Sequence, residues 1–151
     1  MRYKQARRKQ KGGLLLDATI GICLLAILGL LFAGSLTAAV SVRGATDERT
    51  KAIWAANREI EALENLGYAN MTYSGLVFYN LIEPETTTSP YVFTSIGNTS
   101  DRISTLLPSG TGSITVTDIS STVREVTVTV SWVARSGSRS ISLSTRMADM
   151  K

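Results

Sequence analysis

The chain has 151 residues, of which 44% are hydrophobic and 19% charged, so it fits one compact domain and is too apolar for an extended disordered chain. It contains no histidine and one cysteine, which excludes Ser-His-Asp and Cys-His nucleophiles, Cys/His zinc sites and an intrachain disulfide. The formal net charge is +4, but six of the 16 basic residues lie in the first eleven positions. Because the remainder is slightly acidic, the charge does not favour a nucleic-acid-binding body.

Residues 1–12 form a basic leader, and residues 14–42 form an apolar run in which Asp17 is the only charged residue. About 20 apolar residues span a bilayer as a helix, whereas the apolar region of a cleaved secretory signal has only about 7 to 15. The sequence therefore predicts a retained single-pass transmembrane helix over residues 13–42, in the cytoplasmic (inner) membrane. The positive leader predicts a cytoplasmic N-terminus, with everything after Arg43 outside.

Asp17 is the anomaly of this run. An ionised carboxylate inside a membrane segment costs about 2.5 to 3.5 kcal/mol, so Asp17 indicates either solvation near the headgroups or a functional partner. A cut after Gly12 would create a new α-amine on Gly13, four residues before Asp17. If the amine of one subunit meets the Asp17 carboxylate of the next, each offsets the other's desolvation and the pair fixes the register of adjacent helices. Removal of the leader would then switch assembly on.

The order of basic leader, Gly12-Gly13, three leucines, Asp17 and apolar helix resembles the class III signal of type IV pilins and of type II secretion pseudopilins. In that family a prepilin peptidase cuts after a glycine, and an acidic residue stands fifth in the mature chain. The resemblance implies cleavage between Gly12 and Gly13, N-methylation of Gly13 and an assembly role for Asp17. A cut after Gly13 would leave the acid fourth. Glycine replaces the usual first phenylalanine and aspartate the usual glutamate, departures that suit a low-abundance minor pilin.

Residues 43–67 continue the helical pattern with an amphipathic segment. Its apolar face is expected to consist of Ile53, Ala56, Ile60 and Leu63, which recur at intervals of three and four. No proline occurs before Pro84, so one helix is predicted from Leu14 to Leu66, with a stop at Asn65–Gly67.

Residues 68–110 are the least regular part of the chain. Turn-forming residues surround two short candidate strands, Leu76–Tyr79 and Tyr91–Ile96. The resemblance implies that this stretch is the variable connecting region of a pilin.

Residues 111–151 alternate apolar and hydroxyl side chains in three runs, which predicts antiparallel strands with one buried face and one hydroxyl-rich face. Arg135–Arg139 is interpreted as a five-residue hairpin connection, and Trp132 as a core residue. The stretch from Val128 to Thr145 also resembles the carboxyl end of minor pilins, particularly pilus-modification proteins and small pseudopilins. The expected fold is α+β, with a long N-terminal α-helix packed on a small antiparallel β-sheet, as in pilins.

These features favour a minor pilin or pseudopilin that is assembled into a type IV pilus or a type II secretion pseudopilus at the cell surface or in the periplasm. The resemblance implies four partners, namely the membrane, a prepilin peptidase, the assembly machinery, and other pilin or pseudopilin subunits through the N-terminal helix. No catalytic, cofactor or metal site is expected, and no enzymatic activity. Nucleic acid would be a partner only in a DNA-uptake filament, for which Arg135 and Arg139 are the one local basic feature. The alternative is a signal-anchored exported binding domain that does not polymerise.

Overall fold

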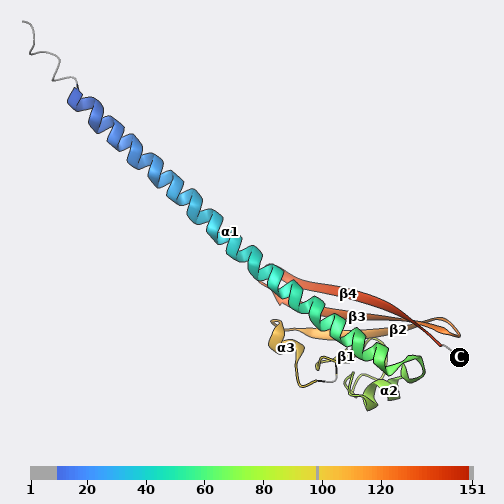
Figure 1. Cartoon of the computed structure of the whole chain (residues 1–151). Coiled ribbons are helices and arrows are strands. Elements are labelled where there is room, and N and C mark those ends of the chain that lie inside the picture. Colours follow the sequence, from blue (N-terminus) through green and yellow to red (C-terminus); the bar gives the residue numbers. More distant parts are fainter. Residues whose placement is uncertain (1–9, 98, 150–151) are drawn as a thin grey trace, which may run out of the picture. The chain divides into compact units, whose positions relative to one another are not determined.

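The computed structural model describes residues 10–97 and 99–149. The chain divides into two compact units, unit 1 (Met1–Gly44) and unit 2 (Ala45–Lys151), and each is described by itself. Helix α1 (Gln10–Leu66) contributes to both units (Figure 1). The single long helix predicted from Leu14 to Leu66 is confirmed, and it begins four residues earlier than expected.

Gly67 ends α1, as the sequence predicts. Its φ of 77° lies in the left-handed region, which glycine adopts without steric cost. In that conformation its N–H group donates to the carbonyls of Leu63 at 3.3 Å and Glu64 at 3.2 Å. Two carbonyls of the last helical turn, which have no partner within the helix, are satisfied in this way.

Unit 2 is built on a four-stranded antiparallel sheet with strand order β1-β2-β3-β4 (Figure 1). The strands are β1 (Tyr91–Phe93), β2 (Thr111–Ser120), β3 (Val123–Ala134) and β4 (Gly137–Ala148). Each strand pairs with the next along the chain, so the sheet is a simple meander. The α+β fold, a long N-terminal helix with an antiparallel sheet, is therefore confirmed.

Alternation along β3 gives the sheet one apolar and one hydroxyl face. Val126, Val128, Val130 and Trp132 are at most 3% exposed, and Trp132 is a core residue as expected. On the opposite face, hydroxyl groups bond across the β3–β4 ladder, with 2.9 Å between Thr127 and Ser144 and 2.8 Å between Thr129 and Ser142. Each buried valine stabilises the sheet by about 1.5 to 3 kcal/mol relative to an exposed one.

The part of α1 in unit 2 lies over the apolar face of the sheet (Figure 1). Of the residues expected on this face, Ala56 and Leu63 are buried and Ile60 is half-buried against the core, as predicted. The buried positions of this part of α1 are Ala52, Ala55, Ala56, Glu59, Leu63 and Leu66. Ile53, assigned to this face from the sequence, is 36% exposed, and that assignment is wrong. The alanines carry no bulk beyond Cβ, so the helix axis can approach the sheet closely, and Ile53 is turned about 100° away from Ala52.

The connecting region contains helices where a strand was expected. Its elements are the 3₁₀ turn η1 (Tyr68–Asn70), α2 (Tyr73–Phe78) and α3 (Ile103–Leu106). The strand predicted at Leu76–Tyr79 is wrong, because Thr72 Oγ1 accepts a hydrogen bond from the Gly75 N–H at 3.3 Å and caps α2. The second candidate strand, Tyr91–Ile96, is confirmed only as the shorter β1.

The β3–β4 hairpin is tighter than predicted. Ala134 pairs with Gly137, so the connection has two residues, Arg135 and Ser136, and not the five of Arg135–Arg139. Gly137 has a φ of 116°, which a residue with a side chain rarely adopts. Arg139 is therefore a strand residue opposite Trp132.

Candidate assembly site

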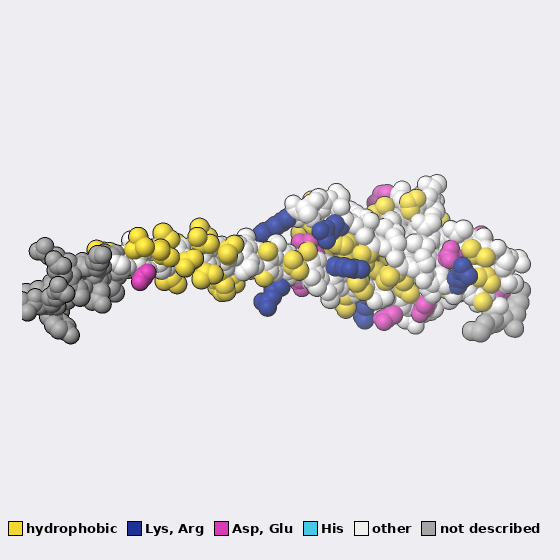
Figure 2. Space-filling view, turned by 90° about the horizontal axis from the view of Figure 1, so that it is seen from above, with side chains coloured by type: hydrophobic (Ala, Val, Ile, Leu, Met, Phe, Trp, Pro, Cys, Tyr) yellow, Lys and Arg dark blue, Asp and Glu magenta, His cyan; other side chains and the backbone are white. Residues whose placement is uncertain are grey.

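Unit 1 presents an exposed apolar helical surface along its described residues. From Leu15 to Gly44 every residue is exposed except the half-buried Gly21. The helix has an 18-residue window of mean hydropathy 2.4, and by length and composition it is able to cross a membrane. Hydrophobic side chains follow unit 1 on the face shown in Figure 2. Such a surface needs lipid or other apolar helices around it.

The hydroxyl groups of this helix are bonded to its own backbone. Thr19 Oγ1 donates to the carbonyl of Leu16 at 2.8 Å, and Ser35, Thr37 and Ser41 donate to carbonyls three or four residues earlier. This pattern satisfies polar side chains without water and makes them tolerable in a membrane. Asp17 differs, since within the described residues its carboxylate has neither a hydrogen bond nor an ion pair. The described chain therefore leaves Asp17 to solvent near the headgroups or to a partner outside the described residues.

Gly12, Gly13 and Asp17 all lie on α1, which begins at Gln10. Gly13 and Asp17 are four residues apart and so share one helix face, with a rise of about 6 Å between them. Apart from its chain neighbours and the adjacent helix backbone, no described atom lies within 4 Å of the position that a Cβ on Gly13 would take. Residues 1–9 of the expected leader lie outside the described residues. The helix thus leaves both the proposed new terminus and the carboxylate open to a neighbour.

Glu59 is a residue that the sequence analysis missed. It has no exposed surface although it lies on the amphipathic part of α1. One carboxylate oxygen accepts the N–H of Gly97 at 2.7 Å, and the other has no hydrogen-bond partner among the described residues. Burial raises the pKa of Glu59 from 4.5 to about 7, and the bond from Gly97 partly opposes that rise. Glu59 therefore ties the loop after β1 to α1.

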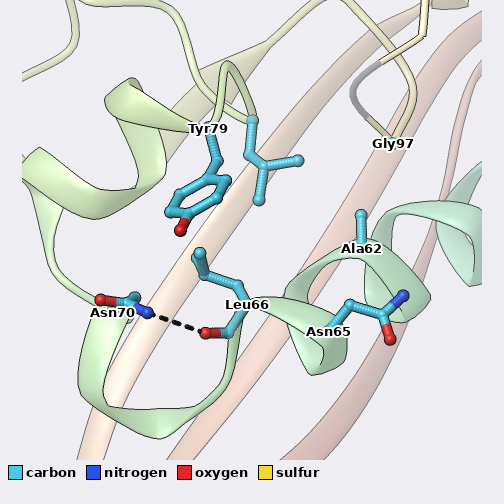
Figure 3. Close-up of a pocket in the computed structure, with 7 residues that line it drawn as sticks. Ala62, Asn65, Leu66, Asn70, Tyr79 and Gly97 are labelled. Atoms are coloured by element: carbon cyan, nitrogen blue, oxygen red, sulfur yellow. Dashed lines mark hydrogen bonds between the residues drawn. The ribbon is translucent and has the colours of Figure 1, made fainter.

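A pocket of about 380 Å³ opens beside this contact, entirely within unit 2 (Figure 3). Its lining combines apolar and amide side chains, namely Ala62, Asn65, Leu66, Asn70, Tyr79 and Leu81, together with Gly97. Asn70 donates its amide N–H to the carbonyl of Leu66 at 3.1 Å, which satisfies another free carbonyl at the end of α1. In Figure 3 the Tyr79 ring points across the pocket toward Leu66. The volume is within the range of small-molecule sites.

Comparisons with protein-family models, with curated proteins and with solved structures found no match for this chain.

Proposed function

We propose that the chain is a minor pilin or pseudopilin, a membrane-inserted precursor that loses its basic leader and is then assembled into a type IV pilus or a type II secretion pseudopilus. The observation that carries the proposal is Asp17, a carboxylate without a partner in an apolar helix whose other polar side chains are bonded to the backbone. Its place four residues after Gly13 matches the register in which a new α-amine and a carboxylate can pair between subunits.

Physical chemistry supports this pairing. A lone ammonium or carboxylate group loses favourable hydration when it enters hydrocarbon, and this desolvation cost is lower when the two groups pair with each other. The apolar surface of unit 1 is exposed along its described residues, so packing against equivalent helices would replace lipid contacts with protein contacts. In this arrangement the N-terminus is cytoplasmic before assembly, and unit 2 lies on the outer side of the membrane.

Leader removal is the first test. When the chain is co-expressed with a prepilin peptidase, the intact mass of the membrane-extracted protein should fall by residues 1–12, with a further methyl group on Gly13. Gly12→Leu should abolish the cut, because a bulky side chain replaces the glycine at the scissile bond. A chain that keeps its leader with an active peptidase, or a Gly12→Leu variant that is trimmed normally, would contradict the assignment.

The role of Asp17 has its own test. We expect Asp17→Asn to enter the membrane normally but to reach sheared filaments at one tenth or less of the wild-type amount, since one lost ion-pair partner costs about 1.4 kcal/mol or more in this setting. Asp17→Glu is the matched control, because it keeps the charge and restores the family's usual acid. Equal recovery of Asp17→Asn and wild type in the filament fraction would remove the register role.

The pocket beside Glu59 favours a second candidate, a signal-anchored domain that binds a ligand outside the cell and does not polymerise. That candidate predicts an intact leader and a membrane fraction without filaments. The mass measurement therefore separates the two functions.

A further inference from the structure

Contacts within unit 2 define which end of the sheet lies near Ala45, where α1 joins the unit. Trp132 Nε1 donates to Glu48 Oε2 at 3.1 Å, and Thr145 Oγ1 donates to Glu64 Oε1 at 3.0 Å. Because Trp132 is near the end of β3 and Thr145 pairs with Val126, β3 runs antiparallel to α1. The Arg135-Ser136 turn follows Trp132 by three residues, so it lies at the Ala45 end of the unit.

This Ala45 end, defined as residues 45–51 and 132–139, is positively charged. It holds the cations Arg49, Lys51, Arg135 and Arg139 against the acids Asp47 and Glu48. The rest of unit 2 holds five Lys or Arg residues against nine Asp or Glu residues. Figure 2 shows Lys and Arg side chains gathering toward this end on the face in view. The Ala45 end therefore has a net positive charge although the net charge of the whole unit is small and negative.

The cations of the Ala45 end are only partly neutralised. Lys51 pairs with Asp47 at 2.7 Å. Arg139 donates to the neutral hydroxyl of Ser136 at 2.9 Å and has no ion-pair partner in the part of the chain that the structure describes. Arg49 and Arg135 are exposed and form no ion pair within the described residues. Arginines of this kind are available to an anionic partner.

We propose that the Ala45 end of unit 2 binds the anionic headgroups of the membrane from which α1 emerges. The inference rests on the membrane insertion contained in the proposed function. Val42, the last residue of the apolar run, precedes Arg49 by only seven residues in the sequence. The chain therefore keeps Arg49 close to the membrane that the apolar run enters, and charges attract the surface most strongly within the Debye length of about 8 to 10 Å at physiological salt.

A membrane surface suits this charge distribution better than a nucleic acid. A free polyanion would be repelled by the acidic remainder of unit 2, whereas a lipid surface is reached only by the end that the chain itself holds next to it. Tethering also gives the surface a high effective concentration, so a few cations suffice. Each arginine close to an anionic bilayer strengthens the contact about fivefold.

The test uses the full chain in nanodiscs of phosphatidylcholine, with or without about one third phosphatidylglycerol as the anionic lipid. A fluorophore is attached to Ser138→Cys, beside the hairpin turn, in a Cys23→Ala background, and the lipid headgroups carry a nitroxide quencher. The same label on Ser121→Cys is the positional control, because Tyr68 bonds the carbonyl of Ser121 at the opposite end of the unit.

Quenching at position 138 should rise several-fold in anionic discs and fall to the neutral-disc level in about 1 M salt, where the Debye length is about 3 Å. Arg135→Gln should weaken the anionic-disc contact about fivefold, and adding Arg139→Gln should weaken it further. Arg146→Gln is the matched control, since Arg146 pairs with Glu125 away from this end and should change nothing.

Quenching at position 138 that ignores lipid charge and salt, or that equals the quenching at position 121, would overturn the proposal. Equal effects of Arg135→Gln and Arg146→Gln would also overturn it. Cleavage and filament formation are not needed for any of these measurements. A chain that keeps its leader but shows the lipid-dependent signal would therefore reject the pilin function and leave the lipid contact standing.

Discussion

Glu59 sets a dependence of stability on pH that can be assigned to one residue. Its pKa is 4.5 as an ordinary carboxyl and about 7 in the folded chain, so between these values the native state binds more protons than the unfolded state. The free energy of unfolding must then fall as the pH rises through this window. The shift corresponds to a loss on the order of 3 kcal/mol by about pH 8. Below about pH 4.5 Glu59 is protonated in both the folded and the unfolded chain, so burying it carries no charge-desolvation penalty.

Glu59→Gln should remove this dependence. Glutamine keeps an oxygen that can accept the Gly97 N–H and never ionises. The gain in stability of the variant over the wild type should therefore grow from near zero at about pH 4.5 to on the order of 3 kcal/mol at about pH 8. Urea unfolding of the full chain in detergent, followed by tryptophan fluorescence, measures the difference. The two proteins differ at one residue, so the difference between their pH profiles isolates the contribution of Glu59. A constant difference across this range would show that Glu59 is not the titrating group.

At the scale of elements, a helix or strand is easier to predict when its pattern of apolar and polar residues repeats over many positions. The strands β3 and β4 were predictable because apolar, more buried positions alternate with hydroxyl-bearing, less buried ones over many residues. Helix α1 was predictable for the same reason, from its apolar run and the absence of proline. Helix α2 was not, because its six residues are too few to display a period, and its cap by Thr72 depends on one contact.

Burial of single residues was harder to predict than the elements that carry them. A large apolar residue such as Ile53 is a natural marker of a buried helix face, but close packing on the sheet selects the small alanines on the next face. Glu59 reads as a solvent-facing charge in the sequence, and only the placement of Gly97 from a distant loop reveals that it is buried. The hairpin connection was predicted too long because serines occur both in the turn and at the start of β4, so the sequence does not mark where β4 begins.

The candidate assembly site was also predictable from the sequence only in part. The spacing of Gly12, Gly13 and Asp17 is a property of sequence, and no fold is needed to find it. The lack of a partner for Asp17 among the described residues needed the structure, since another side chain could have met it. The bonds from Thr19 and Ser35 to the helix backbone supplied the contrast that makes Asp17 distinctive.

At the scale of the whole molecule, the two units differ in what stabilises them. The buried hydrophobic core runs from Ala52 to Met147 and so lies wholly within unit 2. Unit 1 has an exposed apolar surface and depends on its surroundings. A minor filament subunit would use this separation, since the environment of unit 1 must change from lipid to protein while the fold of unit 2 stays the same.

A chain that begins at Ala45 should therefore fold without unit 1. We expect it to be soluble and to unfold cooperatively, with a free energy of unfolding within about 1 kcal/mol of the full chain in detergent, because no core residue is removed. The matched control begins at Gly67 and lacks the buried alanines and leucines of α1, which exposes the apolar face of the sheet. That shorter chain should aggregate or lose cooperative unfolding. If the chain from Ala45 behaved in the same way, the stability of unit 2 would depend on the apolar helix, and the helix could not exchange lipid for protein partners while leaving the sheet unchanged.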